Sequence, residues 1–143
     1  MLYTEKTKKA LKLCFEAHKD QTDKSGLPYV FHPFHLAEQM ETEDTTVVAL
    51  LHDVVEDTDY TLKDLAEMGF GESVIKALTL LTHDDSVEYM DYVRAIKADP
   101  IAKAVKLADL RHNSDLSRMD TVTEKILARR EKYLKAITFL EQE

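Results

Sequence analysis

A chain of 143 residues, 44% of them hydrophobic, is long enough for a full hydrophobic core, and we expect a single domain over residues 1–143. With 27 Asp and Glu against 19 Lys and Arg, the formal net charge of -8 argues against nucleic acid and anionic membranes as partners. Three Gly and three Pro are too few turn residues for a sandwich or barrel of many short strands, so the predicted fold class is all-α.

Apolar periodicity and capping signals predict about eight helices. The first runs from about Glu5 to Gln21 behind Thr4 as its N-cap residue, and a DKSGLPY loop follows it. Pro33 suits the first position of a short helix that continues over 34–40. Asp44 is the expected N-cap residue of the next helix, which is broadly buried and ends at the DTDY segment.

Five more helices are expected in the second half of the chain. Thr61 with Asp64 resembles a capping box for a helix over 62–68. Thr121 with Glu124 resembles another for the last helix, which reaches the C-terminus. Between these two, the pattern predicts helices over 73–81, 87–98 and 100–116.

Cysteine content and hydropathy bound the location of the protein. Cys14 is the only cysteine, so the sequence offers no disulfide and no thiolate zinc site. The first residues lack the continuous apolar stretch of a secretory signal, and no apolar run approaches the roughly 18 residues of a membrane span. We therefore expect a cytoplasmic protein without a membrane partner.

The densest set of chemically active side chains lies in the segment ALLHDVVED. His52 and Asp53 are polar residues in a helix that is otherwise apolar on most of its circumference, and buried polar groups need partners. Helical geometry places Glu56 one turn beyond both and Asp57 one turn beyond Asp53. An exposed acidic helix end is the alternative, but a helix C-terminus disfavours negative charge, and a bound divalent cation would relieve that cost. The pattern favours a metal or catalytic site.

A second polar stripe lies on the predicted helix over 100–116. Asp109, His112 and Asn113 follow one another at helical spacing in an otherwise apolar segment. Imidazole and carboxylate ligands suit Mn, Fe, Zn or Mg, and a metal site with open positions can activate water for hydrolysis. A capping or core hydrogen-bond network is the alternative reading of this stripe.

Three segments, YVFHP, ALLHDVVEDT and VKLADLRHN, resemble in that order the HD-domain hydrolases, specifically the (p)ppGpp hydrolase domain of the RelA/SpoT family and its small stand-alone relatives. The resemblance runs from about Ala17 to Asn113. It implies an all-α HD-domain bundle and a divalent metal ion, usually Mn²⁺. The implied metal ligands are His32, His52, Asp53 and Asp109.

The resemblance also assigns roles around the metal. Glu56 and Asp57 match acids that position or activate the attacking water and assist proton transfer. The positions that match nucleotide contacts are Lys24, Ser25, Asn113 and Tyr133. For Tyr133, an ordinary place on a core-facing helical stripe is an open alternative. Orientation of the metal ligands and ordinary core hydrogen bonding both remain open for His18, His35 and His112.

Three departures from the family lie at the substrate end of this implied site. Asp23 stands where the family commonly has Arg, whose guanidinium can stack on the base, and the change removes a cation–π contact worth roughly 0.5 to 2 kcal/mol. The basic residue that follows the Asp ligand is displaced, since residues 109–111 read DLR. Ser114-Asp115 stands where a basic residue is usual. We therefore expect an intact hydrolytic core and leave base specificity open.

The leading interpretation is a metal-dependent hydrolase that removes the 3′-diphosphate of guanosine tetra- or pentaphosphate and releases pyrophosphate. A related enzyme acting on a different nucleotide is the near alternative. A non-catalytic nucleotide or metal sensor belongs to another class, and retention of both Glu56 and Asp57 argues against it. A helical nucleic-acid binder is disfavoured by the charge. Since 143 residues leave no room for the synthetase domain of the long relatives, we expect no second activity.

Overall fold

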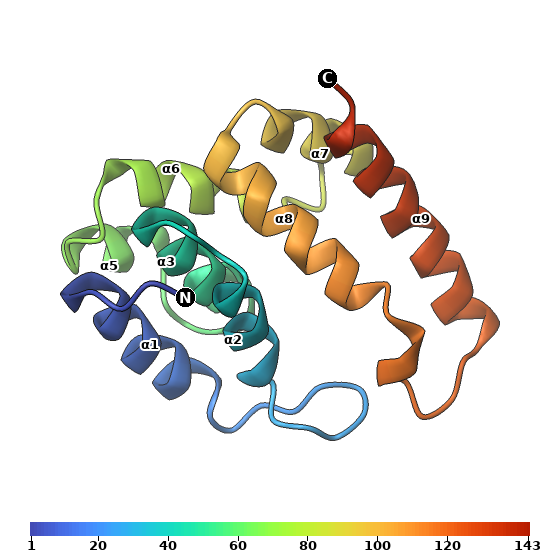
Figure 1. Ribbon diagram of the computed structural model, residues 1–143, viewed down its shortest axis with the longest axis horizontal. Coiled ribbons are helices and arrows are strands. Elements are labelled where there is room, and N and C mark those ends of the chain that lie inside the picture. The colour runs from blue at the N-terminus through green and yellow to red at the C-terminus, as the bar shows by residue number, and fades with distance from the viewer.

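The computed structural model describes residues 1–143 and consists of helices and loops, with one isolated bridge between Thr22 and Pro28 in place of any strand (Figure 1). The predicted all-α class is confirmed. In chain order the elements are α1 (Glu5–His18), α2 (Phe31–Glu38), α3 (Glu43–Leu51), α4 (Val54–Asp57), α5 (Leu62–Glu67), α6 (Glu72–Leu81), α7 (Tyr89–Lys97), α8 (Pro100–Asn113), the 3₁₀ helix η1 (Leu116–Arg118) and α9 (Glu124–Glu141).

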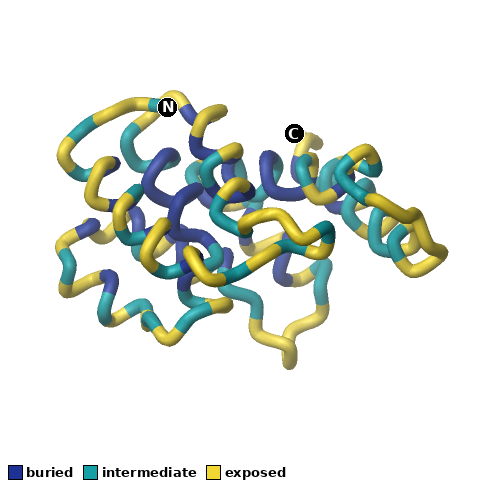
Figure 2. Tube along the Cα trace, turned by 90° about the horizontal axis from the view of Figure 1, so that it is seen from below, coloured by how far each residue is buried: buried dark blue, intermediate teal, exposed yellow.

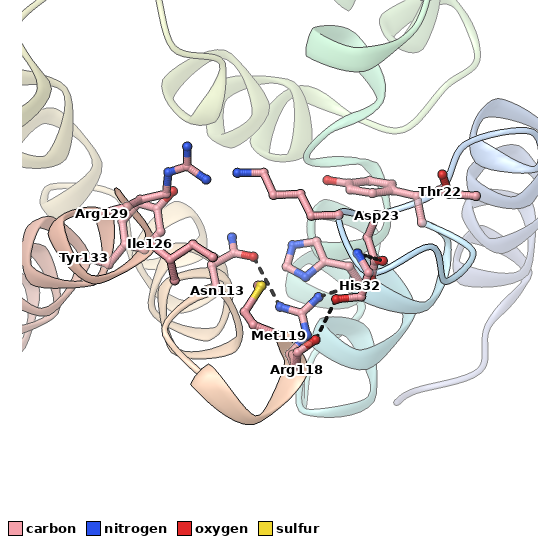
Figure 3. A pocket seen from close by; sticks show the side chains of 12 residues that line it. Thr22, Asp23, His32, Asn113, Arg118, Met119, Ile126, Arg129 and Tyr133 are labelled. Carbon is pink, nitrogen blue, oxygen red and sulfur yellow. Dashed lines mark hydrogen bonds and ion pairs between the residues drawn. The ribbon is translucent and has the colours of Figure 1, made fainter. Parts of the chain in front are cut away.

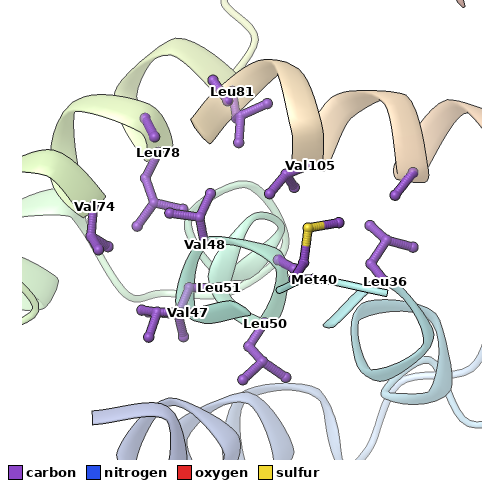
Figure 4. Close-up of a cluster of buried hydrophobic side chains, with 14 of the residues drawn as sticks. Leu36, Met40, Val47, Val48, Leu50, Leu51, Val74, Leu78, Leu81 and Val105 are labelled. Atoms are coloured by element: carbon purple, nitrogen blue, oxygen red, sulfur yellow. The ribbon is translucent and has the colours of Figure 1, made fainter. Parts of the chain in front are cut away.

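Helix α3 is the centre of the bundle. It packs against α1, α2, α6 and α8, and every residue from Thr46 to Leu51 is buried (Figure 4). A helix that is apolar on all sides must be covered on all sides, and each fully buried Leu or Val contributes roughly 1.5 to 3 kcal/mol. Figure 2 shows the buried segments gathered in the interior, with exposed residues on the loops around them. This packing fixes the C-terminal end of α3 deep in the molecule.

Helices α8 and α9 form the other side of the molecule. α8 packs against α3, α6 and α7, and α9 lies along α8 and touches α7 (Figure 1). Along α9 only Ala136 and Leu140 are buried, so this helix is peripheral. Helix α8 therefore lies between the core and α9, and the polar side chains of α9 remain free to contact a ligand.

Two of the predicted N-caps are confirmed and two are wrong. Thr4 and Thr61 each accept a hydrogen bond from the third residue of the helix that follows. The cap of α3 is Thr42 rather than Asp44, because Thr42 has the extended backbone that a cap requires and its hydroxyl accepts from Thr45 N at 3.2 Å. Asp44 instead lies in the first turn of α3, 4.0 Å from Lys6.

The cap of α9 differs in the same way. Thr123, not Thr121, is the N-cap residue, and its hydroxyl accepts from Ile126 N at 3.2 Å. Several helix ends also move by a few residues: α1 ends at His18, and α8 ends at Asn113, where η1 takes over after a short turn. No helix combines the length and the apolar character that crossing a membrane requires.

The largest differences from the predicted elements lie at the two segments that carry histidines. α2 begins at Phe31, so Pro33 is its third residue rather than its first, and His32 lies inside the helix. Proline is tolerated there because the first-turn N–H groups have no partner within the helix. The single helix expected after Asp44 is divided into α3 and α4, and His52 and Asp53 form the turn between them.

Candidate active site

Two histidines and two aspartates from three parts of the fold meet at one point. His32 comes from α2, His52 and Asp53 from the turn between α3 and α4, and Asp109 from α8. One donor atom of each lies within 4.8 Å of all the others. The structure thus brings together the four residues that the sequence predicts as metal ligands.

The ring of His52 is held so that its free nitrogen points into this cluster. Its Nδ1 donates to the carbonyl oxygen of Ala49 at 2.6 Å, which leaves the lone pair on Nε2. Nε2 is buried without a hydrogen-bond partner, and it lies 3.0 Å from Asp53 Oδ2 and 3.5 Å from Asp109 Oδ1. A lone pair that faces two carboxylates is stabilised only by a cation between them, so the donor set fits a metal ion.

The pKa values of His52 and Asp53 also indicate that the cluster favours a positive charge. Burial lowers the pKa of His52, but the carboxylates of Asp53 and Asp109 outweigh burial and raise it well above its usual 6.5. Burial raises the pKa of Asp53, and the neighbouring His52 more than offsets it, so the net pKa of Asp53 is lowered. A proton on His52 therefore balances the charge of the cluster when no metal ion does.

Two side chains donate hydrogen bonds to Asp109, and the His32 ring lies beside it. His32 Nε2 lies 2.9 Å from its Oδ1, Asn113 Nδ2 donates to Oδ1 at 3.0 Å, and Lys106 Nζ donates to Oδ2 at 3.1 Å. Burial alone would raise the pKa of Asp109, but the Lys106 ammonium and the two histidines hold it well below its usual 3.8. The carboxylate is thus an oriented anion at neutral pH.

Lys106 is a site residue that sequence reasoning missed, because it reads as part of a solvated face. Its side chain is only 15% exposed, and its ammonium lies 5.2 Å from the ring centre of Tyr92. The one available signal is its spacing: Lys106 precedes Asp109 by three residues on the same helix, which places the two side chains on one face.

Tyr29 is a second missed residue. Its hydroxyl donates to Asp53 Oδ2. Burial raises the pKa of Tyr29, as do the charge and the hydrogen bond of Asp53, so the phenol stays protonated and remains a donor. Apart from its place three residues before His32, the sequence carries no signal for this contact.

The three histidines whose roles the sequence leaves open lie around the cluster. His112 stacks on His32 with 8° between the ring planes, and their Nδ1 atoms are 2.6 Å apart. Burial, Arg118 and the neighbouring histidines lower the pKa of His112 to about 4, so at neutral pH it is uncharged and can accept the Nδ1 proton of His32. His35 lies over His112 at 4.2 Å, and His18 lies 5.0 Å from the Tyr29 ring.

Glu56 and Asp57 belong to the short helix α4 at the edge of the cluster. Glu56 Oε1 accepts from the backbone N–H of His83 at 2.5 Å. Partial burial and the charge of Asp53 raise the pKa of both carboxyls above their usual values, and for Glu56 the His83 hydrogen bond opposes the rise. Carboxyls whose pKa values move towards neutrality suit proton transfer.

A cavity of about 290 Å³ opens beside the cluster, with His32 in its wall (Figure 3). Its other walls come from the loop before α2, the end of α8, η1 and the start of α9. All four residues predicted as nucleotide contacts line it: Lys24, Ser25, Asn113 and Tyr133. The cavity that holds the predicted substrate contacts therefore adjoins the cluster of predicted metal ligands at His32.

The charge around this cavity is opposite to that of the whole chain. Lys24, Arg118 and Arg129 line it, against a single carboxylate from Asp23. A local surplus of cations in a protein of net charge -8 attracts anionic ligands to this point. Arg118 and Arg129 were not anticipated from the sequence.

Ser114 and Asp115, which replace the basic residue usual in the family, make local hydrogen bonds to the backbone. Ser114 Oγ donates to the Leu110 carbonyl oxygen at 2.6 Å at the end of α8, and the Asp115 side chain accepts from Ser117 N at 3.0 Å at the start of η1. Both side chains are thereby engaged with the backbone.

The sequence is similar to proteins of known activity. No protein-family model matches it. The "Guanosine-3′,5′-bis(diphosphate) 3′-pyrophosphohydrolase MESH1" of Mus musculus is 39% identical over 120 residues, which are 73% of this chain and 66% of the mouse protein. The human protein of that name is also 39% identical, over 71% of this chain and 64% of its own length.

Similar bacterial proteins are much longer. The guanosine-3′,5′-bis(diphosphate) 3′-pyrophosphohydrolase of Aquifex aeolicus is 34% identical over 123 residues, 78% of this chain. This chain spans only 18% of that relative and 16% of the bifunctional (p)ppGpp synthase/hydrolase SpoT of Escherichia coli strain K12.

The fold is also similar to a solved structure, described as that of a metazoan ortholog of SpoT that hydrolyses ppGpp. The TM-score is 0.78 at 26% sequence identity, and the match covers 98% of this chain and 87% of the other. The predicted HD-type helical bundle is confirmed by this likeness.

Proposed function

The chain belongs to the family of HD-type hydrolases that includes the MESH1 proteins, and from this premise we propose that it is a metal-dependent guanosine-3′,5′-bis(diphosphate) 3′-pyrophosphohydrolase. The observation that supports this best is the joining of a buried His/Asp cluster to a cation-lined cavity through His32. The proposal takes residues 1–143 as one hydrolase domain. The single cysteine, a free and buried thiol, fits a cytoplasmic location.

We assign metal binding to His32, His52, Asp53 and Asp109. Two imidazoles and two carboxylates form a mixed nitrogen and oxygen set that suits Mn²⁺, the ion we propose. Bound at this site, a divalent ion would supply Lewis-acid polarisation of the phosphate and a lowered pKa for a nearby water. The Nε2 atom of His52 supports the assignment, because it is buried and faces the carboxylates of Asp53 and Asp109 at 3.0 and 3.5 Å.

The acids of α4 manage the protons of the proposed reaction. As a water oxygen bonds to the phosphorus next to the 3′ oxygen, Glu56 accepts the proton that the water releases. The bond between that phosphorus and the 3′ oxygen breaks, and Asp57 is the proposed donor of the proton that the 3′ oxygen gains. Water and guanosine tetraphosphate thus give GDP and pyrophosphate. The raised pKa of both carboxyls supports these roles.

The cavity holds the rest of the nucleotide. Lys24 and Arg129 are proposed partners of phosphate oxygens, since charge-assisted hydrogen bonds to phosphate are the strongest a side chain offers. Ser25, Asn113 and Tyr133 add polar contacts. A volume of about 290 Å³ is close to the lower limit of ordinary ligand pockets, roughly 300 Å³, and suits a single nucleoside with phosphates extending to the cluster.

A nucleotide panel tests the proposal. Mn²⁺-loaded protein is incubated with guanosine 3′,5′-bis(diphosphate), GTP and GDP, and the products are resolved by anion exchange. We expect pyrophosphate and GDP from the first nucleotide and no turnover of the other two, which lack a 3′-diphosphate. Cleavage of 5′-phosphates from GTP or GDP would assign a different phosphohydrolase activity to the site.

A further inference from the structure

An ion pair joins two walls of the cavity. Arg118 on η1 places Nη2 3.8 Å from Asp23 Oδ2 in the loop before α2. The Arg118 and Asp23 side chains are 21% and 20% exposed, and both line the cavity (Figure 3). Neither residue has a role in the proposed hydrolysis, so their presence in the wall of the cavity needs another explanation.

Asp23 has one oxygen engaged and one available. Its Oδ1 accepts from the backbone N–H groups of Ser25 at 2.9 Å and Leu27 at 3.0 Å, which shapes the loop. Its Oδ2 has only Arg118 nearby, at a distance beyond the usual 3.2 Å limit of a hydrogen bond. Oδ2 therefore keeps the capacity to accept hydrogen bonds from a ligand in the cavity.

Arg118 is held in place by its surroundings. Its Nη1 donates to the His112 carbonyl oxygen at 2.8 Å, and its own carbonyl oxygen accepts from Ser25 Oγ at 2.7 Å. A guanidinium fixed in this way offers a planar, weakly hydrated cation on which an aromatic ring can stack. The loop carries Asp23 where the family commonly has an arginine. The guanidinium of Arg118 on η1 thus provides a cation to the same cavity.

We propose that Asp23 and Arg118 form the base-recognition end of the cavity, an inference that rests on the proposed nucleotide substrate. Arg118 presents its plane to a purine ring. Asp23 Oδ2 accepts from the N1–H and 2-amino groups of guanine. A carboxylate can only accept, and guanine carries two adjacent donors on that edge, whereas adenine carries an acceptor at N1. The pair therefore selects guanine over adenine.

Binding of GDP and ADP tests this directly, because the two nucleotides have the same phosphates and differ in the base. Isothermal titration of the wild-type protein should show tighter binding of GDP. Asp23→Asn keeps an acceptor for the Ser25 and Leu27 N–H groups but turns the other oxygen into a donor, so the preference for GDP should fall at least tenfold. Arg118→Ala and Arg118→Lys should weaken both nucleotides about tenfold and leave their ratio unchanged, because stacking does not discriminate between the bases and an ammonium has no plane.

An exposed pair of the same kind provides the control. Asp91 and Arg94 on α7 lie 2.5 Å apart and are 61% and 62% exposed, and Asp91→Asn and Arg94→Ala should change neither affinity. Equal binding of GDP and ADP by the wild type, or an unchanged ratio in Asp23→Asn, would overturn the inference even if the protein hydrolyses guanosine 3′,5′-bis(diphosphate). A GDP preference that Asp23→Asn abolishes, in a protein without hydrolase activity, would support the inference and remove the proposed function.

Discussion

His52 shows how one side chain is prepared for a cation. The backbone of Ala49 takes the proton of Nδ1, and Nε2 is left buried between two carboxylates. Its neighbour His32 is arranged similarly through His112. Two oriented imidazole lone pairs and two oriented carboxylates would need little side-chain movement to bind an ion. In this sense the proposed metal site is preformed.

Glu56 provides the sharpest test of a catalytic role. Because its carboxylate accepts the water proton in the proposed reaction, Glu56→Gln should lower kcat about 10²- to 10⁴-fold while bound Mn²⁺ stays the same. Pyrophosphate release and metal content are measured on the same preparation. Glu67→Gln, an exposed change on α5, is the control and should leave both quantities unaltered. Full turnover in Glu56→Gln would remove the residue from the mechanism.

The raised pKa of Glu56 also predicts a pH dependence. A general base works only when deprotonated, so activity rises with pH through its pKa. Because partial burial raises the pKa of Glu56 from its usual 4.5, the acid limb of kcat/KM should lie above pH 4.5. Circular dichroism at each pH checks that the protein stays folded. An acid limb at or below 4.5 contradicts the assignment of the limb to Glu56.

The sequence predicts the residues of the site that stand in recognisable motifs, and misses those whose role depends on burial. His32, His52, Asp53 and Asp109 can be read from their segments, and the structure brings them together. Lys106 and Arg118 cannot, because a basic residue reads the same in the sequence whether its cationic group faces solvent or an aspartate, which lies one turn away on α8 for Lys106 and in the loop before α2 for Arg118.

The junction between α3 and α4 is the element on which the site depends. His52 (φ -59°, ψ -30°) and Asp53 (φ -103°, ψ -1°) form this turn, and from it their side chains meet His32 of α2 and Asp109 of α8. Periodicity did not predict the break, because the apolar residues on both sides of it continue one pattern. The cost of the break is offset by packing, since Leu50, Leu51 and Val54 are all fully buried.

The start of α3 offers a test of the helix boundaries. Thr42→Ala removes the hydroxyl that caps α3 and should lower the free energy of unfolding by about 1 kcal/mol. Asp44→Ala removes only a partly exposed ion pair with Lys6 and should cost less than about 0.5 kcal/mol. Urea unfolding of both variants gives the comparison. A larger loss for Asp44→Ala would restore Asp44 as the cap.

Binding of the proposed ion should stabilise the whole bundle. Three parts of the fold contribute the proposed ligands, so metal binds the native state far better than the unfolded chain. At a free Mn²⁺ concentration 100-fold above the dissociation constant, stability should rise by about 2.7 kcal/mol. Asp53→Asn should abolish most of this gain and the exposed Asp59→Asn should not, as thermal unfolding with and without Mn²⁺ will show. Equal stabilisation of both variants would place the ion elsewhere.

Different parts of the molecule provide the two halves of the proposed site, as their packing shows. The core around α3 fixes the proposed metal site, and α9 with the loop before α2 supplies walls of the cavity proposed to bind the substrate. The buried apolar pattern of the sequence predicts the core around α3 well. The walls of the cavity depend on how exposed loops and one peripheral helix meet, which local periodicity does not encode. This is why all four predicted ligands meet, while Arg118 and Arg129 emerge only from the structure.

The most direct test is a titration of Mn²⁺ into metal-stripped protein, with bound metal and pyrophosphate release from guanosine 3′,5′-bis(diphosphate) measured at each step. We predict that release is absent at the start, rises in proportion to bound Mn²⁺ and levels off at one ion per chain. Full release from the stripped protein, or none with the site filled, would contradict the assignment of this site to metal-dependent hydrolysis.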